Sequence, residues 1–532
     1  DDFALCARGR YLPSLERRLQ VCINNVQNWV SNNGFKFSTS KTVCMHFTKQ
    51  RGLFPEPSLF VGGTQIKAVE EAKFLGVVFD RKLSFLNHIQ YLKTSCQKAL
   101  DVLRVVGHTD WGADRTTLLR LYRALVRSKL DYGAIVYGSA RKSYLKLLDP
   151  IHHQGLRICL GAFRTSPVHS LYVEAGEPSL SLRRERLTLN YALKLKAHPE
   201  NPAYDSVFKS DLSDIYDAHP NEIRPLSLRV RPLLQAAGVD SGQISESLYH
   251  VSPPWTLPVP EIWLDLTKYK KSETAGPVFQ QCLNEIFSHC PGFERIYTDG
   301  SKSEDGRVGS AAVFGKNYEH SVKHRLLDGC SVYSAELQAI LLALKHVYQS
   351  KKWNFLILSD SLSALQALQS QDSEHPLLVQ ILDLHSALIK DGKDVIFVWI
   401  PSHLGLVGNS AADRAANEAR GGCILDKSMP FSDFNPFISR YLQGKWQTQW
   451  DALPSCKLRD VVPLLSEAVP RCRASRREET VLARLHIGHT YITHAYLLKG
   501  EDPPFCFACN EIFTVDHFLL RCADLIEIRH KY

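Results

Sequence analysis

The chain has 532 residues, of which 44% are hydrophobic and 22% charged, and its formal net charge is +9. This length exceeds the ~100–200 residues of one typical domain, and the apolar content is sufficient for packed cores, which excludes general disorder. No apolar run reaches the ~20 residues of a membrane helix and no basic-then-apolar segment opens the chain, so we expect a nuclear or cytoplasmic protein, without membrane contact or secretion.

Charge and cysteine usage bear on partners and redox state. The diffuse positive charge favours polyanionic partners, although a slightly basic protein without such partners has the same composition. The 14 cysteines are mostly single, and without an export signal they predict reduced thiols. The sequence opens at Asp1 and contains only two methionines, Met45 and Met429, so we interpret it as a fragment, a processed product or a conceptual translation.

Residues 1 to about 200 form a basic region with mainly helical periodicity. Apolar side chains recur at helical spacing in residues 15–30, and the same periodicity returns in residues 88–106 and 115–138. Between them, apolar runs around a Gly62–Gly63 turn predict short strands. This part of the chain is therefore expected to be helical with a small strand region near its start.

The pattern changes twice after residue 200. Residues near 200–290 contain many prolines, including Pro253 and Pro254, and predict a connecting region with little power to form a core. From Glu294 onward, strand and helix patterns alternate. We predict strands at residues 293–301, 309–315, 321–327, 355–360 and 394–402, and helices at residues 334–349, 361–369 and 409–420. This order predicts an α/β fold, a mixed sheet flanked by helices.

Four acidic residues occupy informative places in this α/β module. Asp299 is expected at the end of its first strand, Glu336 in the first turns of its long helix, and Asp360 at the end of a buried strand. Asp413 falls within the last helix. Because the carboxyl ends of strands share one edge of a sheet, and a packed helix can turn a side chain toward it, we expect the four carboxylates to gather there.

Such a cluster predicts metal binding. Carboxylates within a few Å raise one another's pKa and oppose folding, whereas Mg²⁺ ions prefer carboxylate oxygens. Two metals ~3.5–4 Å apart can activate water and stabilise the leaving oxygen of a phosphodiester. Taken singly, an acid is usually a solvated surface group: Asp299 can start a turn and Asp360 can cap a helix.

The sequence motifs around these acids favour the metal site over four unrelated surface groups. YTDGS at Asp299, SAELQAI at Glu336, LSDSLSAL at Asp360 and WIPSHLGLVGNSAADRAA at Asp413 resemble the RNase H family, in the family's order. The resemblance implies that the four acids bind two Mg²⁺ ions, or Mn²⁺, and hydrolyse the RNA strand of an RNA–DNA hybrid. It also implies that His403 assists proton transfer or product departure.

The same resemblance suggests supporting roles for three residues that lie near the acids in the sequence. Gly408 and Asn409 are expected to cap the last helix and orient Asp413. Ser301 is expected to contact the nucleic-acid backbone. Most affinity should come from phosphate contacts and fall with salt, and the 2′-OH in the minor groove should distinguish RNA from DNA.

The N-terminal region has a second resemblance. DDFALCAR, NGFKFSTSKTVCMHF and KFLGVVFDRKLSFLNHI resemble the late palm and the thumb of reverse transcriptases from non-LTR retrotransposons, over roughly the first 150 to 200 residues. Asp1 and Asp2 match that family's acidic pair, and Lys41 its downstream basic motif. The third carboxylate and the nucleotide-binding segments do not occur in this sequence, so we expect a vestigial polymerase module without activity. Basic residues of the thumb-like stretch suggest some affinity for nucleic acid: Arg115, Arg120, Arg123, Arg127 and Lys129.

The C-terminus carries a cysteine–histidine cluster. Cys506, Cys509, His517 and Cys522 form a C-x₂-C…H-x₄-C pattern, which can complete a closed, structural Zn²⁺ site. The surrounding tail resembles the one that follows RNase H in arthropod non-LTR elements of the jockey and I type. Ordinary reduced cysteines beside a core histidine are the alternative. We expect packing roles for His486, His489 and His494, and a solvated or RNA-binding face for the basic run Arg471, Arg473, Arg476 and Arg477.

These observations predict five domains and one leading function. The expected domains are a partial palm (1–110), a helical thumb-like region (111–200), a Pro-rich connection (201–290), an RNase H domain (291–425) and a C-terminal region with the zinc motif (426–532). The leading function is ribonuclease H activity of a retrotransposon polyprotein, with RNA–DNA hybrid and the element's RNA and DNA as partners and no small-molecule cofactor. The alternatives are a relic that binds nucleic acid without cutting it and another nuclease of the same fold, such as a resolvase or integrase.

Overall fold

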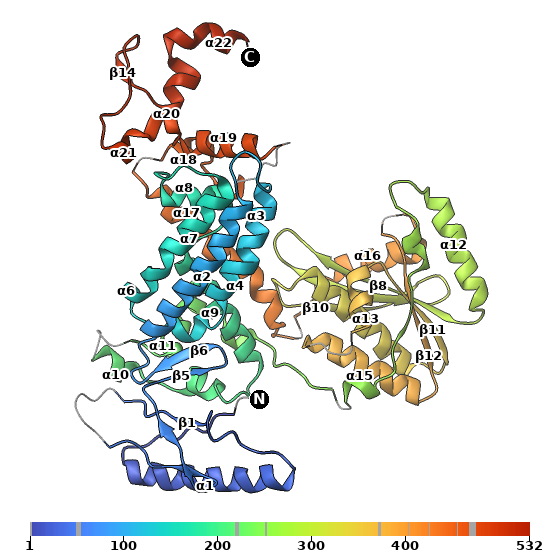
Figure 1. The fold of residues 1–532 in the computed structure, drawn as a ribbon. Coiled ribbons are helices and arrows are strands. Elements are labelled where there is room, and N and C mark those ends of the chain that lie inside the picture. Colours follow the sequence, from blue (N-terminus) through green and yellow to red (C-terminus); the bar gives the residue numbers. More distant parts are fainter. Residues whose placement is uncertain are drawn as a thin grey trace. The chain divides into compact units, whose positions relative to one another are not determined.

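The computed structural model contains two compact units (Figure 1). The structure describes residues 3–48, 55–218, 223–250, 253–370, 374–402, 404–424, 426–454, 456–467 and 475–531. The first unit comprises Asp1–Thr188, Tyr216–Pro225 and Leu442–Tyr532; the second comprises Leu189–Ile215 and Leu226–Tyr441. The stretch expected to form the α/β module, residues 291–425, therefore lies wholly in the second unit.

A six-stranded sheet forms the centre of the second unit. Its strands are β7 (Glu261–Trp263), β8 (Glu294–Lys302), β9 (Val308–Phe314), β10 (His320–Leu326), β11 (Asn354–Ser359) and β12 (Asp394–Trp399). The strand order is β10-β9-β8-β11-β12-β7. β8, β9 and β10 pair antiparallel, whereas β8, β11, β12 and β7 run parallel. The mixed sheet predicted from the sequence is confirmed.

Helices cover both faces of this sheet (Figure 1). They are α12 (Gly276–His289), α13 (Val332–Gln349), α14 (Leu362–Ala367), α15 (Pro376–Lys390) and α16 (Val407–Ala419). The same unit contains α11 (Leu226–Ala236), whose Leu226 packs against Tyr204 and Val207 instead of the sheet. Alternate strand residues face opposite sides. Phe355 and Ile357 of β11 join the core beneath α13 and α15, while Leu356 and Leu358 join the core beneath α12 and α16. The unit is thus a sheet between two helical layers.

Two parts of this unit lie where the sequence predicted none. The proline-rich stretch contributes β7, which pairs with β12 at the sheet edge, and α12, whose Phe279 and Leu283 are buried. α15 also belongs to the covering layer, although we predicted no helix at these residues. The three elements β7, α12 and α15 gain their stability from packing within the sheet and its covering layers, which local sequence patterns do not reveal.

Helix α13 is fixed at both ends. Its N-cap Ser331 accepts a hydrogen bond from the backbone N–H of Ser334, and buried Asp433 in turn accepts from the N–H and hydroxyl of Ser331. At the other end, the Lys393 ammonium donates to the carbonyls of Val347 and Ser350. An N-cap of this kind contributes roughly 0.5–2 kcal/mol, and a cation at a helix C-terminus about 0.3–1 kcal/mol. They hold the long helix, and the acid it carries, in one register on the sheet.

The first unit is mainly helical, with short strand pairs near its start. Its helices are α1 (Leu12–Asn32), α2 (Leu86–Val106), α3 (Arg115–Tyr122), α4 (Ser128–Asp131), α5 (Ala134–Tyr137), α6 (Lys142–Leu145), α7 (Asp149–Leu160), α8 (Val168–Ala175), α18 (Lys457–Val461), α19 (Arg476–Ile487), α20 (Tyr491–His494), α21 (Tyr496–Lys499) and α22 (Ile526–Lys531). Its strands are β1 (Val43–Cys44), β2 (Phe60–Val61), β3 (Thr64–Gln65), β4 (Lys67–Ala68), β5 (Glu71–Phe74), β6 (Val77–Asp80), β13 (Phe505–Cys506) and β14 (Glu511–Ile512). As predicted, β2 and β3 pair around Gly62 and Gly63, which have φ of 56° and 76°. None of the helices in the described residues is long and apolar enough to cross a membrane.

The chain returns to this unit after completing the sheet. Ala483 and Ile487 of α19 are buried in the same core as α2, α3 and α7. Arg476 is 5% exposed, and its guanidinium donates to the backbone carbonyls of Ile158 and Cys159. The interpretation of Arg476 as part of a solvated basic face is therefore wrong, because its charge is buried against the end of α7. Arg471 and Arg473 lie outside the described residues.

Most basic residues of the thumb-like stretch also make contacts inside the unit. Arg115 pairs with Glu174 at 2.8 Å, and Arg123 and Arg127 both pair with buried Glu177. Lys129 donates to the carbonyl of Ser95 at 3.3 Å. Because these side chains are already paired inside the unit, few of their charges and N–H donors remain available to phosphate groups. The nucleic-acid affinity expected of this stretch therefore loses most of its basis.

Candidate functional site

Strand register brings the first two acids together. β8 and β11 are parallel, and their last paired residues are Thr298 and Ser359. Asp299 and Asp360 follow these residues directly and so lie side by side at the edge where the pairing ends. Asp299 does not end its strand, as the sequence suggested, because β8 continues to Lys302 in its pairing with β9. Only the parallel pairing of β8 with β11 ends before Asp299.

A close approach of helix and strand supplies the third acid. Gly300 of β8 packs directly against α13: a Cβ at this position would lie 2.5 Å from the backbone nitrogen of Glu336. The Gly300 N–H also hydrogen-bonds to the Glu336 carboxylate. A larger residue at position 300 would push α13 away from β8. Glycine is therefore what allows Glu336 to reach the two aspartates.

The three carboxylates form a compact, largely buried group. Asp299, Glu336 and Asp360 each offer an oxygen within 4.8 Å of the other two. Asp299 is 8% exposed and Glu336 7%. Burial, followed by the charges of Asp360 and Asp413, raises the pKa of Asp299 to about 7. Burial, followed by the charges of Asp299 and Asp360, raises the pKa of Glu336 well above its usual range.

One atom of this group indicates a cation site. Among the residues that the structure describes, the buried Oε2 of Glu336 has no hydrogen-bond partner. A buried, unpaired carboxylate oxygen on a residue that lies beside two further carboxylates is unfavourable unless a cation compensates it. Hard divalent cations prefer this donor set. The three acids therefore fit metal ions, as the sequence predicted.

The fourth predicted acid stands slightly apart. Within the described part of the chain, Asp413 lies outside the 4.8 Å group, although its charge contributes to raising the pKa of Asp299. Helix α16 reaches the sheet because Gly309 of β9 has no side chain: a Cβ there would lie 2.4 Å from the Ala416 carbonyl oxygen. Asp413 Oδ1 accepts a hydrogen bond from Asn417 Nδ2 at 3.0 Å.

The predicted capping role of two neighbours is wrong, and a third neighbour has a hydrogen-bond partner within the protein. Gly408 and Asn409 do not cap α16, because the N-cap is Leu406 and both lie in the first helical turn. Asn409 Nδ2 instead approaches Asp360 Oδ2 at 3.4 Å. Ser301, expected to contact the substrate, donates its hydroxyl to Asn417 Oδ1 at 2.6 Å. Asn417 itself was missed, although its i+4 spacing from Asp413 on a helix was a usable signal.

Three further residues were predicted to belong to catalytic sites. His403, Asp1 and Asp2 lie outside the described residues.

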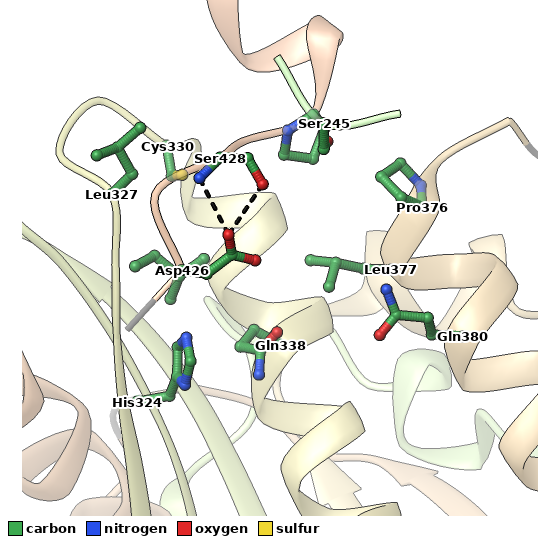
Figure 2. Close-up of a pocket in the computed structure, with 12 residues that line it drawn as sticks. Ser245, His324, Leu327, Cys330, Gln338, Pro376, Leu377, Gln380, Asp426 and Ser428 are labelled. Carbon is green, nitrogen blue, oxygen red and sulfur yellow. Dashed lines mark hydrogen bonds between the residues drawn. The ribbon is translucent and has the colours of Figure 1, made fainter. Parts of the chain in front are cut away.

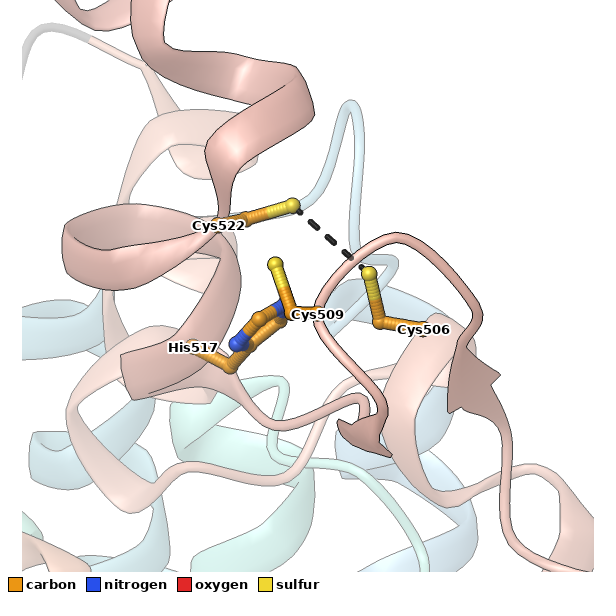
Figure 3. Close-up of side chains that lie close together, drawn as sticks. All are labelled: Cys506, Cys509, His517 and Cys522. Atoms are coloured by element: carbon orange, nitrogen blue, oxygen red, sulfur yellow. Dashed lines mark hydrogen bonds between the residues drawn. The ribbon is translucent and has the colours of Figure 1, made fainter.

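The C-terminal cysteines and histidine form a second candidate metal site (Figure 3). Cys506, Cys509, His517 and Cys522 each offer a ligand atom, and these atoms lie within 4.8 Å of one another. Cys506 and Cys509 come from the β13 turn, and His517 and Cys522 from the following helical turn. The two sulfurs of Cys506 and Cys522 are 3.8 Å apart. Four N and S donors at this spacing match a tetrahedral Zn²⁺ site.

The environment of His517 supports a ligand role. Its Nδ1 contacts the Glu511 carboxylate, while its buried Nε2 has no hydrogen-bond partner among the described residues. A carboxylate on one ring nitrogen orients the other nitrogen toward a metal. Backbone hydrogen bonding at Cys509 lowers the pKa of Cys506 to about 7. A thiolate ligand is therefore accessible near neutral pH.

The other tail histidines have packing roles, as expected. His489 and His494 stack with ring centroids 3.6 Å apart, and His489 shares a hydrogen bond with Thr165. His486 lies 3.5 Å from Glu174. None of the three belongs to the cysteine cluster within the described chain.

A pocket in the second unit is separate from the acids (Figure 2). It is lined by Ser245, His324, Leu326, Leu327, Cys330, Gln338, Pro376, Leu377, Gln380, Asp426, Ser428 and Pro430. Asp426 accepts hydrogen bonds from the N–H and hydroxyl of Ser428. Gln338 lies two residues after Glu336 on α13, so the two side chains point to nearly opposite sides of the helix. The pocket shares no residue with the acidic group.

Comparison with known proteins identifies the α/β module. Residues 293–420 match the RNase H family. The module is therefore an RNase H domain, with the buried acidic group at the place that the sequence resemblance predicted.

Similar proteins extend the comparison to mobile elements. The chain is 27% identical over 209 residues to the RNA-directed DNA polymerase from mobile element jockey of Drosophila melanogaster, over 38% of this chain and 22% of that protein. It is 28% identical over 196 residues to a putative 115 kDa protein in the type-1 retrotransposable element R1DM of the same species, over 36% and 19%. A retrovirus-related Pol polyprotein from the R1 element of Nasonia vitripennis is 26% identical over 186 residues, over 33% and 54%. The match spans about a fifth of the first two relatives, and the predicted resemblance to such elements is confirmed.

Proposed function

We propose that this chain is a divalent-metal-dependent ribonuclease H that hydrolyses the RNA strand of RNA–DNA hybrids. The observation that carries the proposal is the buried group of Asp299, Glu336 and Asp360, with an unpaired oxygen on Glu336. A structural role does not explain three acids gathered at one sheet edge, because their repulsion opposes folding. The group lies inside the segment that matches the RNase H family.

The chain's own residues prepare the site for this reaction. Asp299, Glu336, Asp360 and Asp413 would hold two Mg²⁺ or Mn²⁺ ions, which when bound supply an activated water and neutralise charge on the leaving oxygen. The Gly300 N–H orients Glu336, and the Asn409 amide orients Asp360. Burial of Asp299 and Glu336 limits competing water around their carboxylates. His403 is proposed to assist proton transfer or product departure.

Substrate selection is proposed to depend on the hybrid's shape and its 2′-hydroxyls. RNA differs from DNA through the 2′-OH displayed in the minor groove, and phosphate contacts supply salt-dependent affinity. By analogy with the jockey and R1 proteins that it matches, the chain is proposed to act within a retrotransposon polyprotein. There it would degrade template RNA after first-strand DNA synthesis.

Cleavage of labelled substrates tests this proposal directly. The purified chain with Mg²⁺ is expected to cut the RNA strand of a hybrid and to leave duplex DNA and duplex RNA intact. Asp360→Asn should abolish cutting, whereas Asp391→Asn, an exposed aspartate at the end of α15, should cut like wild type. Absence of cutting by wild type, or equal cutting by Asp360→Asn, would contradict the proposal and favour a nucleic-acid-binding relic.

We further propose that the C-terminal cluster holds one structural Zn²⁺ ion. All four donors belong to protein side chains, which leaves no open position for a reacting water. The carboxylate of Glu511 beside His517 is the arrangement that holds a metal-binding imidazole in one orientation.

Zinc content after purification tests the second site. Wild type is expected to retain about one zinc per chain, in line with four ligands around one ion. Cys506→Ser should lose it, because a neutral hydroxyl replaces a thiolate. Cys423→Ser, which changes an exposed cysteine outside the cluster, should retain it. Elemental analysis measures the ratio, and equal zinc in wild type and Cys506→Ser would exclude the site.

A further inference from the structure

The fourth acid, Asp413, is attached to the strand that carries Asp299 by a chain of two hydrogen bonds. Ser301 Oγ donates to Asn417 Oδ1 at 2.6 Å, and Asn417 Nδ2 donates to Asp413 Oδ1 at 3.0 Å. Ser301 lies two residues after Asp299 on β8. Because side chains alternate along a strand, both point to the same face of the sheet, the one that α16 covers.

The chemistry of the two bonds fixes the orientation of the Asn417 amide. An ionised carboxylate only accepts hydrogen bonds, so the amide must present its NH₂ group to Asp413. Its oxygen then needs a donor on the other side, and the Ser301 hydroxyl supplies one. Without Ser301, the amide oxygen would lose this bond and the amide would be free to turn. Ser301 therefore acts on Asp413 only through Asn417.

Backbone packing makes this connection possible. Asp413 and Asn417 are four residues apart on α16 and so lie on one side of the helix. Ser301 pairs with Gly309 across the β8–β9 ladder. Gly309 is a position where α16 comes very close to the sheet, since a Cβ added there would lie 2.4 Å from the Ala416 carbonyl oxygen. The serine hydroxyl is thus within reach of the helix.

We propose that Asn417 is a positioning residue, held by Ser301, that fixes the Asp413 carboxylate relative to the metal site. One carboxylate oxygen accepts from the amide, which would leave the other oxygen to face a bound cation. This inference rests on the proposed metal-dependent function. It adds a reason why the Asp413 carboxylate, which comes from α16, keeps a fixed position relative to the other three acids. Loss of the amide would let the carboxylate rotate and weaken metal binding.

Metal dependence of cleavage tests the proposal in the full chain. Asn417→Ala is expected to raise the Mg²⁺ concentration for half-maximal hybrid cleavage by about 10–100-fold, the range typical for groups that orient metal ligands. Saturating Mg²⁺ should restore most of the maximal rate, because the four acids are intact. Glu418→Gln, the next residue on the same helix and exposed, breaks only an ion pair with Lys323 and should match wild type.

A double-mutant cycle separates this role from a general structural one. Because Ser301 acts through Asn417, Ser301→Ala should weaken metal binding in the wild-type background but change it by less than about twofold in the Asn417→Ala background. Asn417→Ala should likewise have little effect when combined with Asp413→Asn. An unchanged or lower Mg²⁺ requirement in Asn417→Ala, or multiplying effects of the two substitutions, would overturn the proposal.

Direct Mn²⁺ titration by calorimetry distinguishes failure of this inference from failure of the proposed function. If wild type does not cut hybrids, the proposed function fails, while the Mn²⁺ affinities of wild type and Asn417→Ala still report on Asn417. Weaker Mn²⁺ binding by Asn417→Ala supports the positioning role. Equal affinities contradict it, even if wild type is an active nuclease.

Discussion

Asp299→Asn is expected to abolish hybrid cleavage while making the metal-free protein more stable. Asp299 contributes an oxygen to the buried acidic group. Loss of a residue that merely orients a metal ligand costs about 10–100-fold in activity or affinity, so loss of a ligand should exceed about 100-fold. The amide has nearly the same shape but carries no charge, and so it relieves repulsion with Asp360 and Glu336.

The pKa of Asp299 determines how pH should change the difference in stability between wild type and Asp299→Asn. The folded-state pKa of Asp299, about 7, lies above its ordinary value. The protonated carboxyl is therefore favoured in the folded protein, and that stabilisation is fully present at low pH and lost as pH rises through about 7. In EDTA, Asp299→Asn should unfold at a higher temperature than wild type at pH 8.5. The difference should shrink toward pH 5.5.

Comparing the two proteins at each pH removes other titrating groups. Burial lowers the pKa of His385 to about 4, so acid destabilises the fold elsewhere, equally in both proteins. Mg²⁺ should raise the melting temperature of wild type, because a ligand bound only by the folded state adds about 2.7 kcal/mol at 100 times its Kd. It should have a much smaller effect on Asp299→Asn. Glu304→Gln, an exposed acid in the turn after β8, should behave as wild type. A lower melting temperature for Asp299→Asn in EDTA at pH 8.5 would refute the repulsion argument.

Glu479→Met is expected to destabilise the first unit by about 3–5 kcal/mol, the cost of removing one partner of a buried ion pair. Glu479 is 5% exposed on α19, accepts from the backbone N–H of Arg115 at 2.7 Å and lies 3.7 Å from the Arg476 guanidinium. Without it, Arg476 keeps a buried charge with no counter-charge at this position, and the Arg115 N–H loses its acceptor. Methionine replaces the volume but neither interaction.

Chemical denaturation monitored by tryptophan fluorescence can measure this loss. Glu479→Gln should cost less than Glu479→Met, since the amide oxygen can still accept from the Arg115 N–H. Glu478→Met, at the adjacent exposed position of the same helix, should stay within about 0.5 kcal/mol of wild type, as is usual for exposed positions. If Glu479→Met and Glu478→Met had equal effects, the buried network would not stabilise the unit.

Much of the second unit was predictable because its signals are local. The strands around Asp299 and Asp360 and the helix around Glu336 have regular apolar periodicity, and Asp360 directly follows the end of its strand. β7 and α12 were not predictable in this way. β7 is a three-residue edge strand, and it is a strand only because β12 offers it a partner.

The finer geometry of the site depends on tertiary contacts. Nothing in the local sequence shows that Gly300 is a point of very close approach between β8 and α13, or that Ser301 reaches Asn417 across 116 residues. The supposed cap residue Asn409 was misplaced because the helix begins two residues earlier, at Val407. Similarly, the arginines of the first unit resemble a surface patch until Glu174, Glu177 and Glu479 are seen beside them.

The return of α19 to the first unit has a consequence for biosynthesis. The hydrogen bond between Arg115 and Glu479 joins residues 364 positions apart, and the whole RNase H domain is translated between them. Domains generally fold in the order in which they leave the ribosome. The RNase H domain can therefore complete its sheet before Ala483 and Ile487 of α19 join the core of the helices that precede it. A ribosome that stalled after the RNase H domain would release a folded domain joined to a helical unit that lacks the side chains of α19 in its core.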